Sequence, residues 1–239
     1  DLEKFDNALF ERKDLEWIRH SYLLLLQFAW DQQYYDAVKG KYGFDEFLTK
    51  YDDVVGGWEA YMIWPTWPRL GLDQRNQWDM YRDLPGGLKE LRRQADYAHT
   101  RGTKYFIAYN PWDESTRKED HLKGMEDVLR ITNTDGVVLD TWGESSREFQ
   151  AAADRVKPGV VLYSEGMAVP KDMPGIAAGR VHDAIYMPPP RVQIISSSPY
   201  LHRQLRAMIL YPLPAKMRAT RSSPSLPTAM RSCDIQGFR

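Results

Sequence analysis

Residues 133–166 read NTDGVVLDTWGESSREFQAAADRVKPGVVLYSEG. Two short apolar runs, Gly136–Leu139 and Val160–Tyr163, flank an amphipathic segment, and β-branched runs between turn residues are typical of buried strands. A strand, a helix and a strand within about thirty residues form a βαβ unit, whose two strands are parallel. Asp140 follows the first run and Glu165 follows the second. The two acids are therefore predicted to lie side by side at the carboxyl edge of a parallel sheet, where α/β proteins place their sites.

The same alternation of short apolar runs and amphipathic segments extends along most of the chain. We expect strands to begin near residues 21, 58, 104, 136, 160 and 181, helices over residues 2–19, 45–51, 83–101, 119–130 and 145–156, and a long loop over residues 65–82. Ser145 and Glu148 have capping-box spacing for the last of these helices. The series predicts an α/β fold, a (β/α)8 TIM-type barrel of which about six units are present.

The C-terminal part of the chain differs in kind from the rest. Residues 191–239 are rich in Pro, Ser and Arg and carry a net charge of +7, which leaves −8 for residues 1–190, and all eight tryptophans precede residue 143. Two more strand–helix units would need about sixty residues. We therefore predict a catalytic-type barrel domain at residues 1–190, apparently incomplete, and an irregular basic tail at residues 191–239. One hypothesis is that this tail is foreign to the fold.

Composition excludes several classes of protein. Hydrophobic residues make up 43% of the chain and charged residues 27%, which is typical of a globular domain. The apolar run Leu23–Leu26 is far shorter than the ~20 residues of a membrane span, so no membrane partner is expected. A single cysteine, Cys233, excludes an internal disulfide. No signal peptide is visible, but the chain begins at Asp1, which fits a removed leader or a fragment, and the compartment stays open between a secreted or periplasmic location and others.

Neither a metal nor a nucleotide cofactor is indicated. The five histidines are scattered without ligand spacing, so each is expected to be a surface or packing residue, and the paired glycines lack the spacing of a phosphate-binding loop. The basic tail has no interleaved aromatic residues, so nucleic acid is not expected as a partner. No oligomeric state follows from the sequence.

Aromatic and acidic residues follow the predicted strands one after another. The residues at these strand ends are Trp30 and Asp31, Trp64 and Trp67, Trp112 and Asp113, and Trp142 and Glu144. Indole faces stack on the C–H faces of sugars, and carboxylates accept hydrogen bonds from hydroxyl groups, so the set predicts a carbohydrate-binding rim. The alternative for each single tryptophan is packing of the barrel, because tryptophan is usually largely buried.

Asp140 and Glu165 are the candidate catalytic residues. Cleavage of a glycoside needs two carboxyl groups, and we assign Asp140 as nucleophile and Glu165 as general acid and base. The structural alternatives for Asp140 are a charge partner for the following helix or a bend residue. The alternative for Glu165 is an ion pair with Arg147 or Lys171. Asp183 is a rival acid, but it lies at the start of its predicted strand.

The motifs DGVVLDTWGE and VVLYSEG resemble the (β/α)8 retaining glycoside hydrolases of the α-amylase and α-galactosidase type. In the α-amylase-like group an aspartate nucleophile ends the fourth strand and a glutamate acid/base ends the fifth, and Asp140 and Glu165 match that pattern. Val138 stands where that group has an arginine, and the carboxylate of the seventh strand has no visible counterpart. The resemblance covers residues 21–190 and implies a retaining hydrolase.

The sequence therefore predicts a two-carboxylate glycoside hydrolase. Two alternatives stay open. One is a non-catalytic or truncated carbohydrate-binding barrel, and the other is a barrel lyase or isomerase that uses the same acids for proton transfer.

Overall fold

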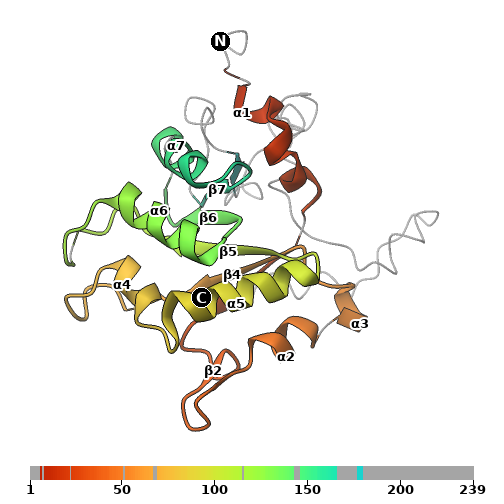
Figure 1. Cartoon of the computed structure of the whole chain (residues 1–239), viewed down its shortest axis with the longest axis vertical. Helices are drawn as coiled ribbons and strands as arrows, with labels where there is room; N and C mark the ends of the chain where they lie inside the picture. The colour runs from red at the N-terminus through yellow and green to blue at the C-terminus, as the bar shows by residue number, and fades with distance from the viewer. Residues whose placement is uncertain are drawn as a thin grey trace, which may run out of the picture.

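A computed structural model describes residues 6, 8–21, 23–50, 52–66, 69–114, 116–142, 146–165 and 177–179. Its centre is a parallel sheet of six strands in the order β1-β4-β5-β6-β7-β8. Figure 1 labels the inner strands β4, β5, β6 and β7. The strands are β1 Leu24–Phe28, β4 Ala60–Trp64, β5 Lys104–Tyr109, β6 Gly136–Leu139, β7 Val161–Ser164 and β8 Ala178–Gly179. Strands of this sheet that follow one another along the chain are neighbours in it, as in a barrel. Within the described residues the sheet is open, because β1 and β8 each pair with one neighbour only.

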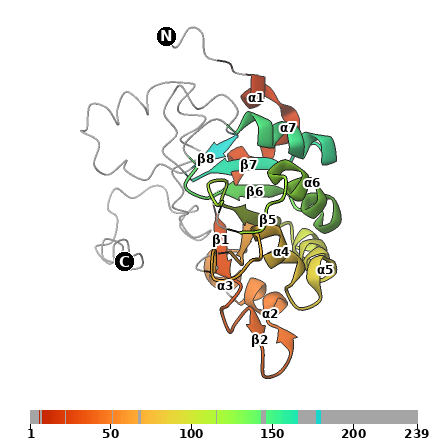
Figure 2. The same ribbon diagram turned by 90° about the vertical axis from the view of Figure 1, so that its left-hand side faces the viewer.

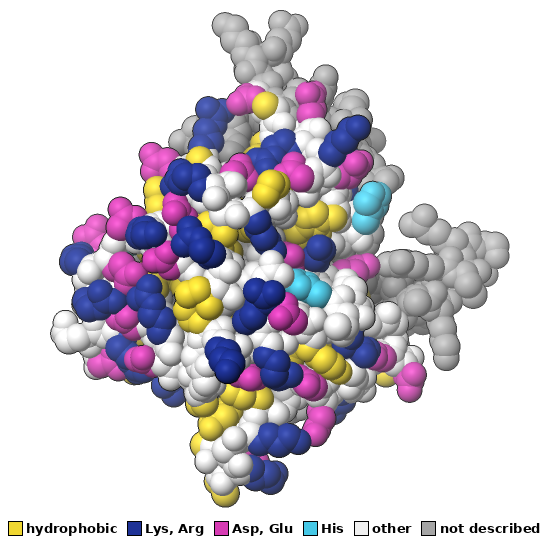
Figure 3. Space-filling model, in the orientation of Figure 1, with side chains coloured by type: hydrophobic (Ala, Val, Ile, Leu, Met, Phe, Trp, Pro, Cys, Tyr) yellow, Lys and Arg dark blue, Asp and Glu magenta, His cyan; other side chains and the backbone are white. Residues whose placement is uncertain are grey.

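Helices cover one face of this sheet. They are α4 Gln77–Arg82, α5 Gly87–Thr100, α6 His121–Thr132 and α7 Arg147–Val156, and Figure 2 shows them on the same side of the strands. Alternate strand residues point to this face, so Tyr105 and Ile107 join the buried residues of α5 and α6 in one core. The outer surface of the helices carries Lys and Arg interspersed with Asp and Glu (Figure 3), which is typical of a solvated layer.

The opposite face of the sheet is covered by the N-terminal segment. Its elements are α1 Ala8–Glu11 and the 3-10 helix η2 Lys13–His20. Leu15 is buried against the strand residues of this inner face. The ring of Trp17 meets that of Phe106 edge to face at 6.1 Å, and its Nε1 donates to the carbonyl of Gly159 at 3.0 Å. The N-terminal segment thus packs on the inner face of the sheet, near the amino-terminal ends of the strands.

The predicted strands are confirmed at β1, β4, β5, β6 and β7 with small changes of boundary. The predicted helices at 45–51, 83–101, 119–130 and 145–156 correspond to α2 Phe44–Thr49, α5, α6 and α7. Helix α7 begins at Arg147 with Ser146 as its N-cap. Ser145, on which the expected capping box depends, lies outside the described residues. The predicted lead-in helix at 2–19 is replaced, in its described part, by α1 and η2.

The long loop expected over residues 65–82 is wrong in its second half. Residues 77–82 form α4, whose capping box joins Asn76 and Asp79. A small hairpin of β2 Tyr35–Asp36 and β3 Lys41–Tyr42, and the short helix α3 Asp52–Val55, were also not predicted. These elements are two to six residues long, too short for an apolar period to be recognised, which is why the pattern missed them.

The predicted sixth strand at Val181–Met187, the rival acid Asp183 and the tail at residues 191–239 lie outside the described residues. The place beside β7 is taken by β8, two residues long. No helix in the described part of the chain is both long enough and apolar enough to span a bilayer.

Candidate active site

Asp140 and Glu165 lie next to each other at the carboxyl edge of the sheet. In the register of β6 and β7, Leu139 is opposite Ser164, so the residues that follow them are neighbours. The amide of Asp140 donates to the carbonyl of Tyr109 at 2.8 Å, and that of Glu165 donates to the carbonyl of Leu139 at 3.0 Å. The backbone ladder therefore continues through both acids and holds them rigidly. Their exposed fractions are only 7% and 9%.

A strained turn links the two acids. Thr141 has φ of 51°, a left-handed conformation that is unusual for a β-branched residue. Its amide donates to Glu165 Oε2 at 3.2 Å, so the backbone directly after one acid binds the side chain of the other. Such outliers are found at functional sites more than elsewhere, because the surrounding structure must hold them.

Asn110 connects Asp140 to a buried chain of polar groups. Asn110 lies just after β5, is fully buried, and donates from Nδ2 to Asp140 Oδ2. Its Oδ1 accepts from Thr66 Oγ1 at 3.1 Å, and Thr66 Oγ1 in turn accepts from Trp64 Nε1 at 2.9 Å. The chain crosses three neighbouring strand ends. Because every member is bonded within the interior, the position of the Asp140 carboxylate is coupled to β4 and β5.

Helix α4 clamps the backbone of Asn110. Gln77 Oε1 accepts from the amide of Asn110 at 2.6 Å, and Gln77 Nε2 donates to its carbonyl at 2.7 Å. Trp78, the next residue, stacks on Tyr109 at 4.2 Å between ring centroids. A Cβ on Gly124 would come within 2.2 Å of the Trp78 ring, so glycine is needed in α6 for α4 to approach. This packing places the side chain of Gln77 against the backbone of Asn110, at the carboxyl end of β5.

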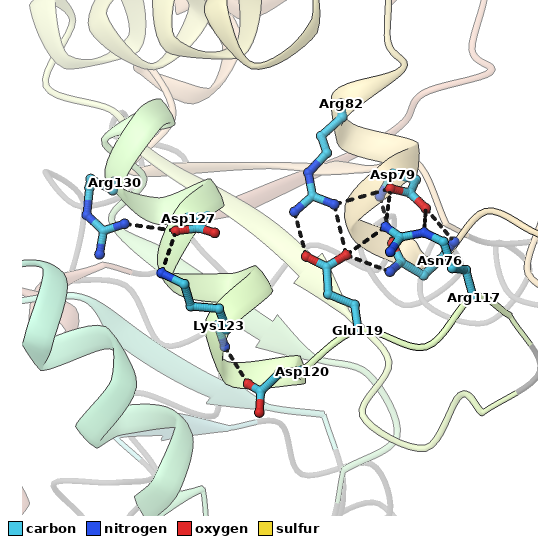
Figure 4. Close-up of polar contacts among 9 residues, drawn as sticks. All are labelled: Asn76, Asp79, Arg82, Arg117, Glu119, Asp120, Lys123, Asp127 and Arg130. Atoms are coloured by element: carbon cyan, nitrogen blue, oxygen red, sulfur yellow. Dashed lines mark hydrogen bonds and ion pairs between the residues drawn. The ribbon is translucent and has the colours of Figure 1, made fainter.

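The loop between β5 and α6 is anchored by an ion-pair network (Figure 4). Arg82 Nη2 contacts Glu119 Oε1 at 2.7 Å, and Arg117 Nη2 contacts Asp79 Oδ1 at 2.7 Å and Glu119 Oε2 at 2.8 Å. Arg82 holds the pKa of Glu119 at about 2, and Arg117 holds that of Asp79 at about 2. The network fixes residues 117–119 to α4, at the end of the loop that carries Trp112 and Asp113.

Two of the predicted rim tryptophans expose their rings. Trp30 is 41% exposed and stacks on Phe28 at 4.3 Å, and Trp112 is 48% exposed. Asp113 is nearly buried and accepts from Thr116 Oγ1 at 3.2 Å. Asp31 lies after β1, where its Oδ1 accepts from the amide of Gln33 at 2.9 Å. Both exposed rings follow strand carboxyl ends, as expected.

The remaining predicted residues lie in different surroundings. Trp64 is nearly buried in the inner-face core, and the ring of Trp142 packs edge to face on Phe149 at 6.2 Å. Trp67 and Glu144 lie outside the described residues. Arg147, a possible partner of Glu165 in the structural alternative, forms an ion pair with Asp6 at 3.0 Å. The structure therefore brings together Asp140 and Glu165 most directly.

The sequence did not single out Thr66, Gln77 or Asn110 as site residues. Asn110 follows its strand in the same way as the acids, and that position was the available signal. Gln77 gave no such signal. It lies in α4, where the sequence predicted a loop, and it is 33 residues before Asn110, the residue that it binds. His99, expected to be a surface or packing residue, contacts Asp135 Oδ2 at 2.6 Å at the amino-terminal edge, away from this site.

No group of three or more potential metal-ligating side chains occurs among the residues that the structure describes. The arrangement offers two carboxyl groups at one edge, an amide donor to one of them, and exposed indole rings nearby. Such a set is suited to acid–base and nucleophilic chemistry on a polyhydroxylated ligand.

Comparisons with known proteins give distant likenesses of fold. No family model and no curated protein matches the chain. A debranching enzyme from Nostoc punctiforme is 13% identical with a TM-score of 0.48, covering 71% of this chain and 53% of that one. A product complex of the multi-modular glycogen-degrading pneumococcal virulence factor SpuA is 13% identical with a TM-score of 0.42, covering 70% and 26%.

A β-arabinopyranosidase is 14% identical with a TM-score of 0.40, covering 67% of this chain and 26% of that one. This chain thus spans about half or less of the length of these three structures. At such identities and TM-scores the likenesses do not identify a family.

Proposed function

We propose that this chain is a carbohydrate-active enzyme, a glycoside hydrolase that acts through Asp140 and Glu165. The observation that supports it most is the position of the two acids, one residue past the paired ends of neighbouring parallel strands and largely withdrawn from water. A two-carboxylate site at the carboxyl edge of such a sheet fits the known requirement of glycoside cleavage.

The proposed mechanism is retaining. The Asp140 carboxylate attacks the anomeric carbon while the Glu165 carboxyl gives its proton to the leaving oxygen, which produces a covalent glycosyl–Asp140 ester. Glu165 then takes a proton from water, the water oxygen attacks the same carbon, and Asp140 leaves as carboxylate. The hydrogen bond from Asn110 holds one oxygen of Asp140, and the amide of Thr141 holds one oxygen of Glu165.

Sugar binding in this proposal falls to the rim. Trp30 and Trp112 present exposed rings for stacking, and Asp31 and Asp113 bind hydroxyl groups. The remaining sequence candidates for contact with the sugar are Trp64, Trp67, Trp142 and Glu144. Among these, Trp64 needs a rearrangement to reach a ligand, because it is packed in the inner-face core.

The test is hydrolysis of aryl α- and β-glycosides by the wild type, Asp140→Asn and Glu165→Gln. We expect each variant to lower kcat by at least about 10²-fold, the order that a general acid–base or nucleophilic group contributes. Asp127→Asn, on the solvated face of α6, is the control and should retain activity. NMR of the first product formed should show retention of the anomeric configuration.

A carbohydrate-binding domain without hydrolytic activity is the second candidate. It is favoured by the exposed rings of Trp30 and Trp112 together with the open edge of the sheet in the described residues. In that case wild type and Asp140→Asn bind oligosaccharides equally and neither hydrolyses any aryl glycoside, which overturns the hydrolase proposal. Turnover that is not hydrolysis but still depends on both acids would instead indicate a lyase or isomerase.

A further inference from the structure

A pocket opens beside the rim, away from the pair of acids. It has a volume of about 220 Å³ and lies between the ends of β1 and β4, the hairpin and α4. Ala29 and Pro65, which directly follow the two strands, form one wall. At about 30 Å³ for each water molecule, the space is that of a small organic ligand such as one sugar ring.

The pocket combines an apolar wall with guanidinium groups. Tyr35, Met80 and Leu84 line it, and Met80 is buried against the core. Arg69 and Arg75 line it as well, with Asp83 as the acid among its lining residues. An apolar surface beside two guanidinium groups suits a ligand that has both C–H faces and a negative charge.

The two arginines differ in their partners. Arg75 binds Asp73 through Nε at 3.0 Å and Nη2 at 2.7 Å, and its Nη1 lies 3.7 Å from Asp83 Oδ2. Among the residues that the structure describes, Arg69 has no side-chain hydrogen bond and no ion pair, whereas each of the other described arginines is within an ion pair. Asp73 acts on Arg69 only as a more distant charge, and its own bonds go to Arg75. No described side chain therefore competes for the Arg69 guanidinium, which can bind an anion.

The pocket is connected to the candidate active site through Thr66. The amides of Arg69 and Leu70 donate to the carbonyl of Thr66 at 2.7 and 3.1 Å. The side chain of the same threonine binds Asn110, which binds Asp140. Two strand spacings of about 4.8 Å separate the end of β4 from that of β6, so the pocket and Asp140 are about 10 Å or more apart along the rim. A chain of sugars longer than one unit can extend over such a distance.

We propose that this pocket binds the carboxylate of a uronic acid unit in the substrate, so that the chain acts on an acidic polysaccharide. This inference rests on the proposed function and adds its substrate class. The ring packs on Tyr35, Met80 and Leu84, and the carboxylate pairs with the planar guanidinium of Arg69, whose donors match it in a two-point geometry.

Direct binding of monosaccharides tests this independently of hydrolysis. Glucuronate and glucose are titrated into the full chain by NMR and calorimetry at low salt, with wild type, Arg69→Gln and the control Arg92→Gln. Arg92 is likewise exposed, lies on α5 and pairs with Asp96. We expect glucuronate to bind at least about tenfold more tightly than glucose, and Arg69→Gln to remove that preference while Arg92→Gln keeps it.

Two further arms separate the possible outcomes. Asp140→Asn should keep the preference for glucuronate, so loss of hydrolysis without loss of this preference separates the pocket from the catalytic proposal. Glucose 6-sulfate should bind less tightly than glucuronate, and equal binding would overturn recognition of a carboxylate in favour of charge alone. Equal affinities of Arg69→Gln and wild type for glucuronate, with unchanged circular dichroism, would overturn the site itself.

Discussion

At the scale of single residues, the most informative feature is the buried chain that ends on Asp140. The side-chain amide of Asn110 binds Asp140 and Thr66. Its backbone amide and carbonyl both bind Gln77. A buried polar group left without its partner costs about 1–3 kcal/mol, so such a chain is stable only when complete. The completeness of this one favours a single orientation of the Asp140 carboxylate.

Thr141 and Asn133 both have a left-handed backbone conformation, but the conformation has a different structural origin at each position. Asn133, with φ of 57°, ends α6, where this conformation is common and asparagine tolerates it. Thr141, with φ of 51°, follows a strand and has a β-branched side chain, so its conformation is strained. The strain coincides with the bond from its amide to Glu165.

This difference predicts opposite effects of glycine at the two positions. Thr141→Gly should raise the free energy of unfolding by up to about 1 kcal/mol, because relief of 1–3 kcal/mol of strain exceeds the entropy that glycine adds to the unfolded chain. Asn133→Gly should change it by only a few tenths of a kcal/mol. Urea unfolding of both variants measures the difference, and a Thr141→Gly protein less stable than wild type would show that the turn is not strained.

At the scale of elements, α4 decides how the rim is held. Its residues contact the rim through Gln77, the core through Trp78 and the loop before α6 through Asp79 and Arg82. The helix has six residues and would not be stable alone, so its structure depends on these contacts. Loss of the ion pairs should therefore loosen both α4 and the loop that carries Trp112.

The ion pairs of α4 predict a pH dependence of stability. The pKa values of Asp79 and Glu119 are both about 2, below their ordinary values of 3.8 and 4.5. A lowered pKa contributes stability that is fully present above the ordinary value and is lost as the pH falls toward about 2. After allowance for solvent screening, we expect a loss of about 1–2 kcal/mol per acid between pH 5 and 2.

Comparison of variants isolates this effect. Glu119→Gln should be less stable than wild type at pH 6, and the gap should narrow at pH 2.5, as measured by urea unfolding at both values. Asp96→Asn, which removes a solvated acid on α5, is the matched control and should follow the wild-type pH profile. A gap for Glu119→Gln that stays constant with pH would contradict the assigned role of the carboxylate.

At the scale of the whole molecule, the inner face of the open sheet is covered by residues from the start of the chain. In a closed barrel this face would be filled by the strands themselves. Here Leu15 is buried against it, Trp17 packs on Phe106, and Arg12 ties the segment to Asp154 of α7 at 2.5 Å. The N-terminal segment is thus part of the core in the described structure.

Shortening the side chain of Leu15 should therefore be costly although it lies in an irregular segment. We expect Leu15→Ala to lower the free energy of unfolding by about 2–4 kcal/mol, as for other buried leucines. Val38→Ala, at an almost fully exposed position of the hairpin turn, should change it by less than about 0.5 kcal/mol. Thermal and urea unfolding measure both, and equal stabilities of the two variants would show that the segment does not contribute to the core.

Much of the fold could be predicted from the sequence, since strand β6 and its neighbours are encoded by short apolar runs between turn residues. The same reasoning predicted that Asp140 and Glu165 share one edge, because parallel strands end on the same side. The ends of α7 and the existence of α4 could not be predicted reliably. Capping choices and six-residue helices depend on contacts with distant parts of the chain.

What the sequence alone determined is the parallel α/β order and the placement of two acids after successive strands, since these follow from residues close together in the chain. The tertiary structure decided which groups hold Asp140, since Asn110 and Gln77 meet across 33 residues. It places Arg69 in a pocket where no described side chain pairs with it. It also decided that η2 covers the inner face. Such contacts depend on register and packing of the whole sheet, and no local pattern specifies them.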